Sequence, residues 1–124
     1  MLRECKRVLR PGSRIVFHTI QPTPGLSPLH RRRANRSGPP ATGVRTSYQS
    51  LLSTAGFVDV EARDDTEEYR ATQLRWIAAT ERHEAPMRAA IGDDAYHDRH
   101  LKRQATLRAI DGGLLARYRY SANG

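Results

Sequence analysis

The sequence has a single cysteine and no long apolar run, and these two shortages exclude several classes of protein. One cysteine, Cys5, allows neither an intrachain disulfide nor a cysteine metal cluster, and this favours a reducing compartment. No stretch approaches the roughly 20 apolar residues that a membrane-spanning helix needs. The basic N-terminus also lacks the apolar core of a secretory signal. We therefore expect a cytoplasmic protein without a membrane partner.

The chain also lacks the glycine-rich turn that cradles a nucleotide between a strand and a helix. None of the nine glycines forms a GxG pattern in such a turn, because the pair Gly112 and Gly113 follows a predicted helix. Acidic residues are absent from 21–47, and the whole chain has a net charge of +8. This charge would attract acidic partners at long range, but it is equally typical of an arginine-rich solvated surface.

The first twenty residues organise the predicted fold of this chain of 124 residues. Residues 2–9 place their apolar side chains on one helical face, and Pro11 and Gly12 then end the helix. The strand that follows, Ile15 to Phe17, is apolar without alternation. Such a pattern predicts a strand buried on both faces, as in a parallel sheet covered by helices.

The segment 21–47 differs in composition from the rest of the chain. It holds five of the seven prolines, three glycines and the basic stretch His30 to Arg36. Prolines and glycines at this density predict a loop, which we interpret as a lid-like or disordered insertion.

The remaining sequence alternates between helical and strand patterns. The predicted elements are a helix over 48–55 with Ser47 as its N-cap, a strand over 58–63, helices between 66 and 110 interrupted near Pro86 and Gly92, and a strand over 115–120. The chain is therefore predicted to be a mixed α/β protein.

Two of these segments resemble motifs of one enzyme family. Arg7 to Gly12, RVLRPG, resembles the R-V-L-K-P-G-G signature before the fifth strand of class I S-adenosylmethionine-dependent methyltransferases, with Ser13 in place of the second glycine. Tyr48 to Phe57, YQSLLSTAGF, resembles the helix and turn before the sixth strand. The resemblance implies a partial Rossmann-like sheet of strands five and six with an antiparallel strand seven between them, and added C-terminal helices.

The resemblance extends over 1–124 but covers only the C-terminal part of the family's catalytic domain. It implies a methyltransferase that, in its complete form, uses S-adenosylmethionine and methylates a small molecule. The cofactor-binding half has no counterpart in the sequence, so we expect the isolated chain to bind no S-adenosylmethionine and to be inactive. Whether the chain is itself an enzyme stays open at this point.

Four residues are candidates for the acceptor site. The resemblance places His18 at the sheet edge that faces donor and acceptor, where a histidine can bind the acceptor or act as a catalytic base. Tyr69, Trp76 and His83 lie on one predicted helix and are candidates for substrate binding. A capping histidine and a core aromatic stripe are the ordinary alternatives. His97 and His100 match no zinc motif, and we predict no metal site.

Two other classes of function stay open. The arginines within 31–36 and Arg45 suit a basic nucleic-acid-binding module, but no aromatic residue for base stacking precedes Tyr48 in this segment, so we do not expect nucleic-acid binding. The chain would otherwise be a noncatalytic partner that completes another chain's sheet. The resemblance to half of a catalytic domain implies that the strand at 15–17 has lost one strand neighbour, and the open edge predicts self-association of the isolated chain.

Overall fold

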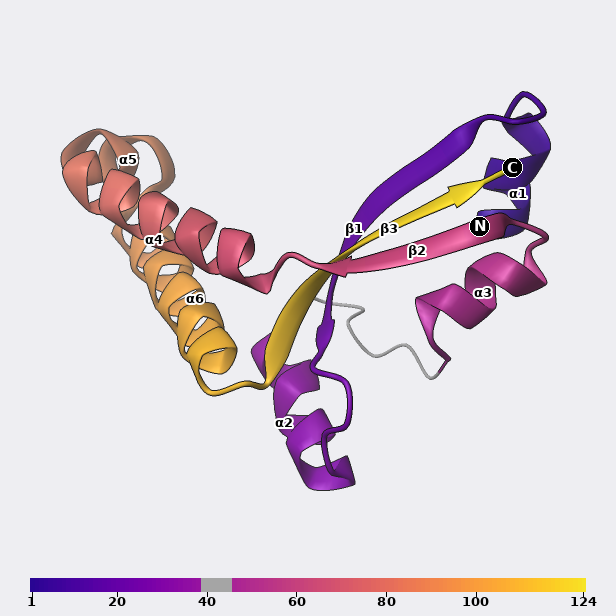
Figure 1. Cartoon of the computed structure of the whole chain (residues 1–124). Coiled ribbons are helices and arrows are strands. Elements are labelled where there is room, and N and C mark those ends of the chain that lie inside the picture. The colour runs from indigo at the N-terminus through magenta and orange to yellow at the C-terminus, as the bar shows by residue number, and fades with distance from the viewer. Residues whose placement is uncertain (39–45) are drawn as a thin grey trace.

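The computed structural model describes residues 1–38 and 46–124, and it confirms a mixed α/β chain (Figure 1). The elements in order are α1 (Leu2–Val8), β1 (Arg14–Pro22), α2 (Pro28–Ser37), α3 (Tyr48–Thr54), β2 (Val58–Asp64), α4 (Thr66–Arg82), α5 (Glu84–Ile91), α6 (Asp93–Asp111) and β3 (Leu115–Asn123). None of the described helices has the length and apolar character needed to cross a bilayer.

The three strands form one sheet in the order β1-β3-β2. The C-terminal strand β3 lies in the middle and runs antiparallel to both neighbours, with Tyr120 opposite Phe17 on one side and Ala62 on the other. The expectation that the last strand lies between the two earlier ones is therefore confirmed. Gly12 has a φ of 76° in the turn that reverses the chain between α1 and β1, a conformation that glycine adopts without strain.

One face of the sheet packs against α1 and α3. The buried residues of this α1–α3 core are Leu52, Phe57, Tyr120 and Ala122. The ring of Phe17 stacks on that of Tyr120 with centroids 5.6 Å apart. Tyr48, from α3, adds a third ring, whose centroid lies 5.4 Å from that of Tyr120. Ser47 caps α3 by accepting a hydrogen bond from the Ser50 amide, as predicted.

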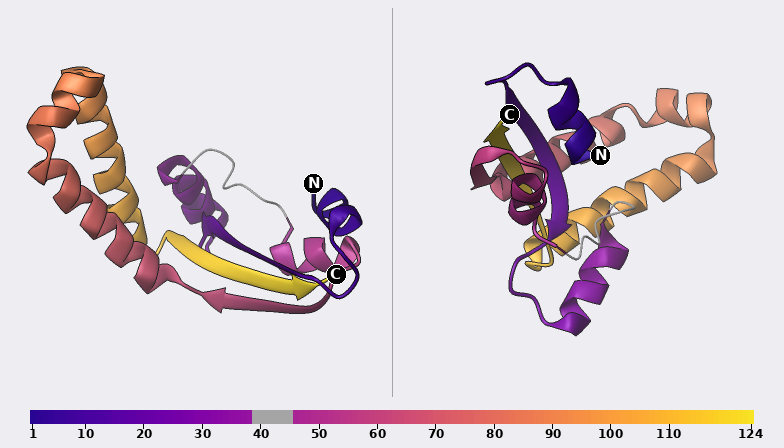
Figure 2. Two further views of the ribbon diagram at one scale, coloured as in Figure 1. Left: turned by 90° about the horizontal axis from the view of Figure 1, so that it is seen from above. Right: turned by 90° about the vertical axis from the view of Figure 1, so that its right-hand side faces the viewer.

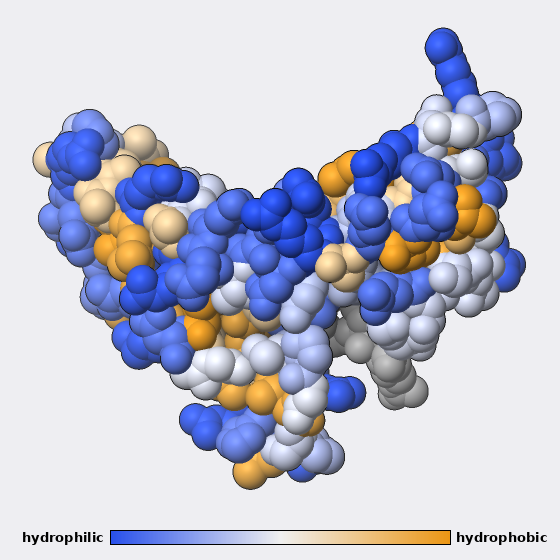
Figure 3. All heavy atoms as spheres, in the orientation of Figure 1, coloured by the Kyte–Doolittle hydropathy of each residue, from blue (hydrophilic) through white to orange (hydrophobic). Residues whose placement is uncertain are grey.

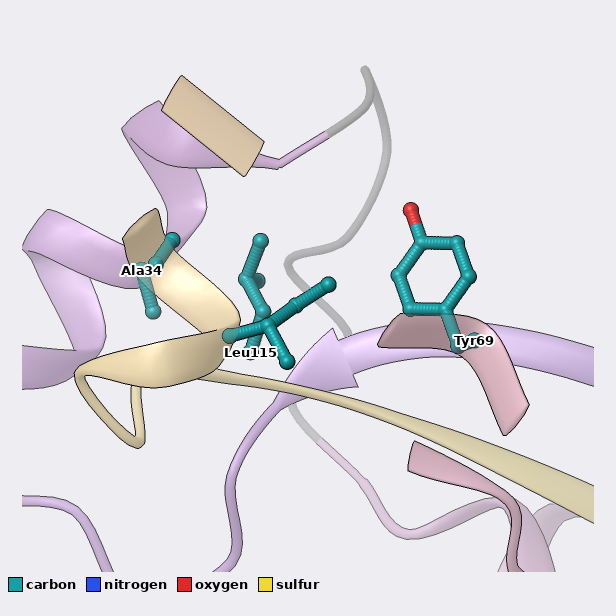
Figure 4. Close-up of a cluster of buried hydrophobic side chains, with 5 residues drawn as sticks. Ala34, Tyr69 and Leu115 are labelled. Carbon is teal, nitrogen blue, oxygen red and sulfur yellow. The ribbon is translucent and has the colours of Figure 1, made fainter. Parts of the chain in front are cut away.

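A second core lies at the other end of the sheet, where α2, α4 and α6 meet β3 (Figure 4). The buried residues of this α2–α4–α6 core are Ala34, Tyr69, Ala109, Ile110 and Leu115. Ile20 of β1 packs against them. Helices α4, α5 and α6 extend from this core as an arm that projects away from α1 and α3 (Figure 2).

The prediction that Ile15 to Phe17 is buried on both faces is wrong. Ile15 and Phe17 are half-buried on the α1–α3 core, whereas Val16 between them is 53% exposed on the opposite face. Further along the strand, Ile20 turns toward the α2–α4–α6 core. The apolar pattern is continuous because β1 serves two cores on opposite faces, at different positions along its length.

The prediction of a loop over 21–47 is also wrong in part, because Pro28–Ser37 is the helix α2. The prolines that suggested a loop flank this helix or occupy its first position, where a missing N–H costs nothing. Ser27 caps the helix, and Ala34 is fully buried in the α2–α4–α6 core. Residues 39–45, which include Arg45, lie outside the described residues.

Removal of the α2 cap is expected to loosen this helix. The hydroxyl of Ser27 accepts a hydrogen bond of 3.2 Å from the His30 amide, and loss of such a cap costs about 1 kcal/mol. Hydrogen exchange of the amides at 31–36 should therefore be several-fold faster in Ser27→Ala than in the unmodified chain. Ser27→Asp, which restores an acceptor at the cap, should return the rates to their original values; equal rates in all three proteins would contradict the assigned cap.

Candidate functional site

A cavity of about 510 Å³ opens on the sheet face opposite the α1–α3 core, between the strands β1 and β3 and the helices α4 and α6. Its lining residues are His18, Ile20, Tyr69, Gln73, Trp76, Lys102, Arg103, Thr106 and Arg117. They come from four elements that are far apart in sequence. The cavity thus exists only because β1 and β3 are paired and α4 and α6 pack side by side.

His18 projects from β1 on this face and pairs with a buried carboxylate. Its Nε2 lies 3.0 Å from Oδ2 of Asp65, which is 4% exposed and stands at the N-cap of α4. The backbone N–H of Asp65 donates to the carbonyl of Arg117, and the other carboxylate oxygen lies 3.2 Å from Arg63 Nε. These contacts hold the carboxylate in place, so it orients the imidazole.

This pairing decides which histidine nitrogen is free. An ionised Asp65 accepts, so Nε2 of His18 carries the hydrogen of that bond. In the neutral ring the lone pair then belongs to Nδ1. The side chain of His18 is 47% exposed, so its ring is accessible to a bound molecule or to water.

Tyr69 stands one turn into α4 and is only 5% exposed. Burial raises the pKa of its phenol above the usual value of 10.0, an effect that outweighs the opposite influence of Gln73, Arg117 and Arg103. Tyr69 therefore keeps its proton at neutral pH and remains a hydrogen-bond donor at the cavity wall.

Trp76 lies two turns further along α4 and is 49% exposed. The guanidinium carbon of Arg103, from α6, lies 4.4 Å from the centroid of its ring. This is a cation–π contact, and it leaves part of the indole face open to a ligand. Because Trp76 is the single tryptophan of the chain, its fluorescence reports directly on this cavity.

The structure brings together three of the four residues predicted for the site. His18, Tyr69 and Trp76 line the same cavity, whereas His83 follows the last turn of α4, is exposed and is not part of the lining. The sequence interpretation did not include Asp65 among the candidate site residues. No local pattern shows that Asp65 meets a histidine 47 residues earlier.

The described residues do not fit the nucleoside part of S-adenosylmethionine. Such a site requires a strand that leads through a glycine-rich turn into a helix, with backbone N–H groups near the ligand. Among the described residues of the first half of the chain, one glycine with positive φ lies between a strand and the helix that follows it. This is Gly25, and no second glycine stands next to it. Within residues 1–38 and 46–124, no three His, Cys, Asp or Glu side chains lie close enough together to hold a metal ion.

Comparison with known proteins identifies the fold. No protein-family model matches the sequence, and no curated protein does either. Among solved structures, the chain is similar to phosphoethanolamine N-methyltransferase 2 of Haemonchus contortus, with a TM-score of 0.78 and 16% identity over 98% of this chain and 28% of that one. A putative sarcosine dimethylglycine methyltransferase of Galdieria sulphuraria gives a TM-score of 0.80 and 12% identity over 98% and 45%.

A third similar structure is a cyclopropane synthase from Mycobacterium tuberculosis, with a TM-score of 0.78 and 13% identity over 99% of this chain and 48% of that chain. The resemblance seen in the sequence is therefore confirmed at the level of the fold. The chain spans between about a quarter and a half of each of these proteins.

Proposed function

We propose that the chain forms the acceptor side of an S-adenosylmethionine-dependent methyltransferase that acts on a small molecule. The observation that carries the proposal is the His18–Asp65 pair beside Tyr69 and Trp76 in one cavity. The fold of methyltransferases supports it. On this proposal residues 1–124 correspond to the later half of the catalytic domain, and groups outside the described residues bind the cofactor.

The proposed role of His18 follows from its free nitrogen. An amine or hydroxyl that gains a methyl group must lose a proton, and we propose that Nδ1 of His18, which lines the cavity, accepts it. Transfer of this proton to His18 would produce an imidazolium, and the buried carboxylate of Asp65 would stabilise its charge through Nε2. Asp65 acts here as a positioning residue.

Tyr69 and Trp76 are proposed to hold the acceptor. The phenol of Tyr69 remains a donor because burial raises its pKa. The half-exposed ring of Trp76 offers an apolar or cationic group a flat surface. His83, although predicted as a third binding residue, lies outside this cavity, and no role in binding is proposed for it.

Methyl transfer by the protein expressed with the coding sequence upstream of Met1 tests the proposal. With labelled S-adenosylmethionine and a panel of small amines, this protein should methylate an acceptor, and His18→Gln should lower kcat roughly 100-fold or more. Asp65→Asn should lower kcat less and shift the pH profile, since it changes the imidazole rather than removing it.

His97→Gln is the matched control, because this histidine is exposed on α6 and does not line the cavity. Its kcat should remain unchanged. Equal rates for His18→Gln and His97→Gln, or no transfer to any amine, would contradict the proposed function.

A further inference from the structure

The cavity that contains His18 carries an excess of positive charge. Its lining includes the permanent cations Lys102, Arg103 and Arg117, and no carboxylate belongs to the described residues of the lining. The nearest buried acid is Asp65, and both of its oxygens already have partners, His18 and Arg63. The charge at this wall is therefore not balanced from within the cavity.

Arg117 is the central cation of this wall. It lies in the middle strand β3, its side chain is 20% exposed, and its buried Nε has no hydrogen-bond partner among the described residues. One terminal nitrogen lies 3.8 Å from a Glu68 oxygen, too long for a hydrogen bond. The guanidinium carbon lies 5.3 Å from the ring centroid of Tyr69. A buried donor without a partner is costly, and a ligand oxygen would satisfy it.

Arg103 provides a second guanidinium on the α6 side. It stacks on Trp76 and makes no ion pair with any carboxylate in the part of the chain that the structure describes. Lys102 differs, because its ammonium lies 2.8 Å from Asp98. The cavity thus contains one arginine from the arm without a carboxylate partner, and one from the sheet whose carboxylate partner, Glu68, lies 3.8 Å away and leaves its Nε unsatisfied.

We infer that this cavity binds an acceptor that carries an oxyanion, a carboxylate or a phosphate, through Arg117 and Arg103. The inference rests on the proposed function, for which it names the class of substrate. Guanidinium groups bind both oxyanions through paired N–H donors, and such charge-assisted bonds are stronger than neutral ones. The anionic end would lie at the arginines, and the group to be methylated would face His18.

The experiment is a titration of the chain followed by the fluorescence of Trp76. The probes form two matched pairs: phosphoethanolamine with ethanolamine, and sarcosine with sarcosinamide. In at least one pair, the member that carries the oxyanion should bind about tenfold more tightly than the member that lacks it, since a hydrogen bond to a charged group contributes more than one between neutral groups. The pair that shows the difference distinguishes phosphate from carboxylate.

Three variants locate the binding. Arg117→Gln should weaken binding of the probe that carries the oxyanion about tenfold or more. Arg103→Gln should also weaken it, and this variant tests the helical arm independently of the sheet. Arg117→Lys should recover only part of the affinity, because a single ammonium does not reproduce the planar donor pair. Circular dichroism confirms that each variant is folded.

Arg3→Gln is the matched control, because it removes one charge from the exposed surface of α1 and lies outside the cavity. It should leave the affinity unchanged. Equal binding of the probes with and without an oxyanion, or equal losses in Arg3→Gln and both cavity variants, would overturn the inference.

The outcomes also separate this inference from the proposed function. Oxyanion binding that depends on Arg117, combined with no methyl transfer in the extended protein, would support the binding site and contradict the methyltransferase. Methyl transfer to ethanolamine and sarcosinamide as fast as to phosphoethanolamine and sarcosine would contradict the oxyanion site alone.

Discussion

The purified chain is expected to sediment as a dimer or larger species at micromolar to millimolar concentration. Strand β1 forms one edge of the sheet, and β3 is its only strand neighbour within residues 1–38 and 46–124. Its outer edge therefore presents unpaired N–H and C=O groups, with the 53% exposed side chain of Val16 next to them. An apolar edge of this kind is a template for pairing with another chain.

Val16→Lys should shift the chain toward the monomer, because a lysine on an edge strand opposes pairing of two such edges. Val8→Lys is the matched control, since Val8 is 68% exposed on α1 and lies outside the sheet. Sedimentation velocity of the three proteins distinguishes the cases. A monomeric unmodified chain that unfolds cooperatively at high concentration would show that β1 needs no further neighbour.

Leu115→Ala is expected to destabilise the chain by about 2–5 kcal/mol, a large part of the 5–15 kcal/mol that stabilises a typical domain. Leu115 is 1% exposed at the start of β3, where α2, α4 and α6 meet the sheet (Figure 4). Truncation leaves a cavity in a core of few residues, which has little capacity to collapse around it. Urea denaturation followed by the fluorescence of Trp76 measures the change.

Leu101→Ala is the control for this substitution, because Leu101 lies on α6 with 46% exposure and its truncation should cost little stability. Leu52→Ala, in the α1–α3 core, tests whether the two cores unfold together. A single transition by fluorescence and by circular dichroism indicates one cooperative unit. A Leu115→Ala chain as stable as Leu101→Ala would contradict the assigned core.

The elements that were predicted from sequence are those with local signals. The cap at Ser47 and the turn at Gly56, whose φ is 91°, fix the ends of α3 wherever it packs. Helix α2 was missed because the prolines and glycines of the whole segment obscured ten residues that contain only one proline, at the first helical position. Composition averaged over a long window does not resolve a helix of this length.

The candidate site was predicted in part for the same reason. The family resemblance places His18 at the sheet edge, and the helical spacing places Tyr69 and Trp76 on one face, so these residues could be named without knowledge of the packing. Asp65 and Arg117 gain their roles from contacts across the sheet, and neither has a local motif. His83 shares the face of α4 that predicted binding, but it follows the last turn of that helix, beyond the reach of the cavity.

On the face shown in Figure 3 the surface is largely polar, with apolar patches near α3, on the arm and at α2. The exposed apolar residues include Val16, Leu29 and Trp76, at 53%, 57% and 49% exposure. A larger assembly that buries these side chains would gain free energy from surfaces that we expect to promote self-association of the isolated chain.

The central place of β3 determines when this sheet can form during synthesis. Strands β1 and β2 do not pair with each other, and each pairs with residues 115–123, which are synthesised after every other described element. Phe17 must therefore remain available for Tyr120 while the elements between them are made. Contacts between residues so distant in sequence form slowly and leave apolar segments exposed in the meantime. The three-stranded sheet therefore forms only after β3 has been synthesised.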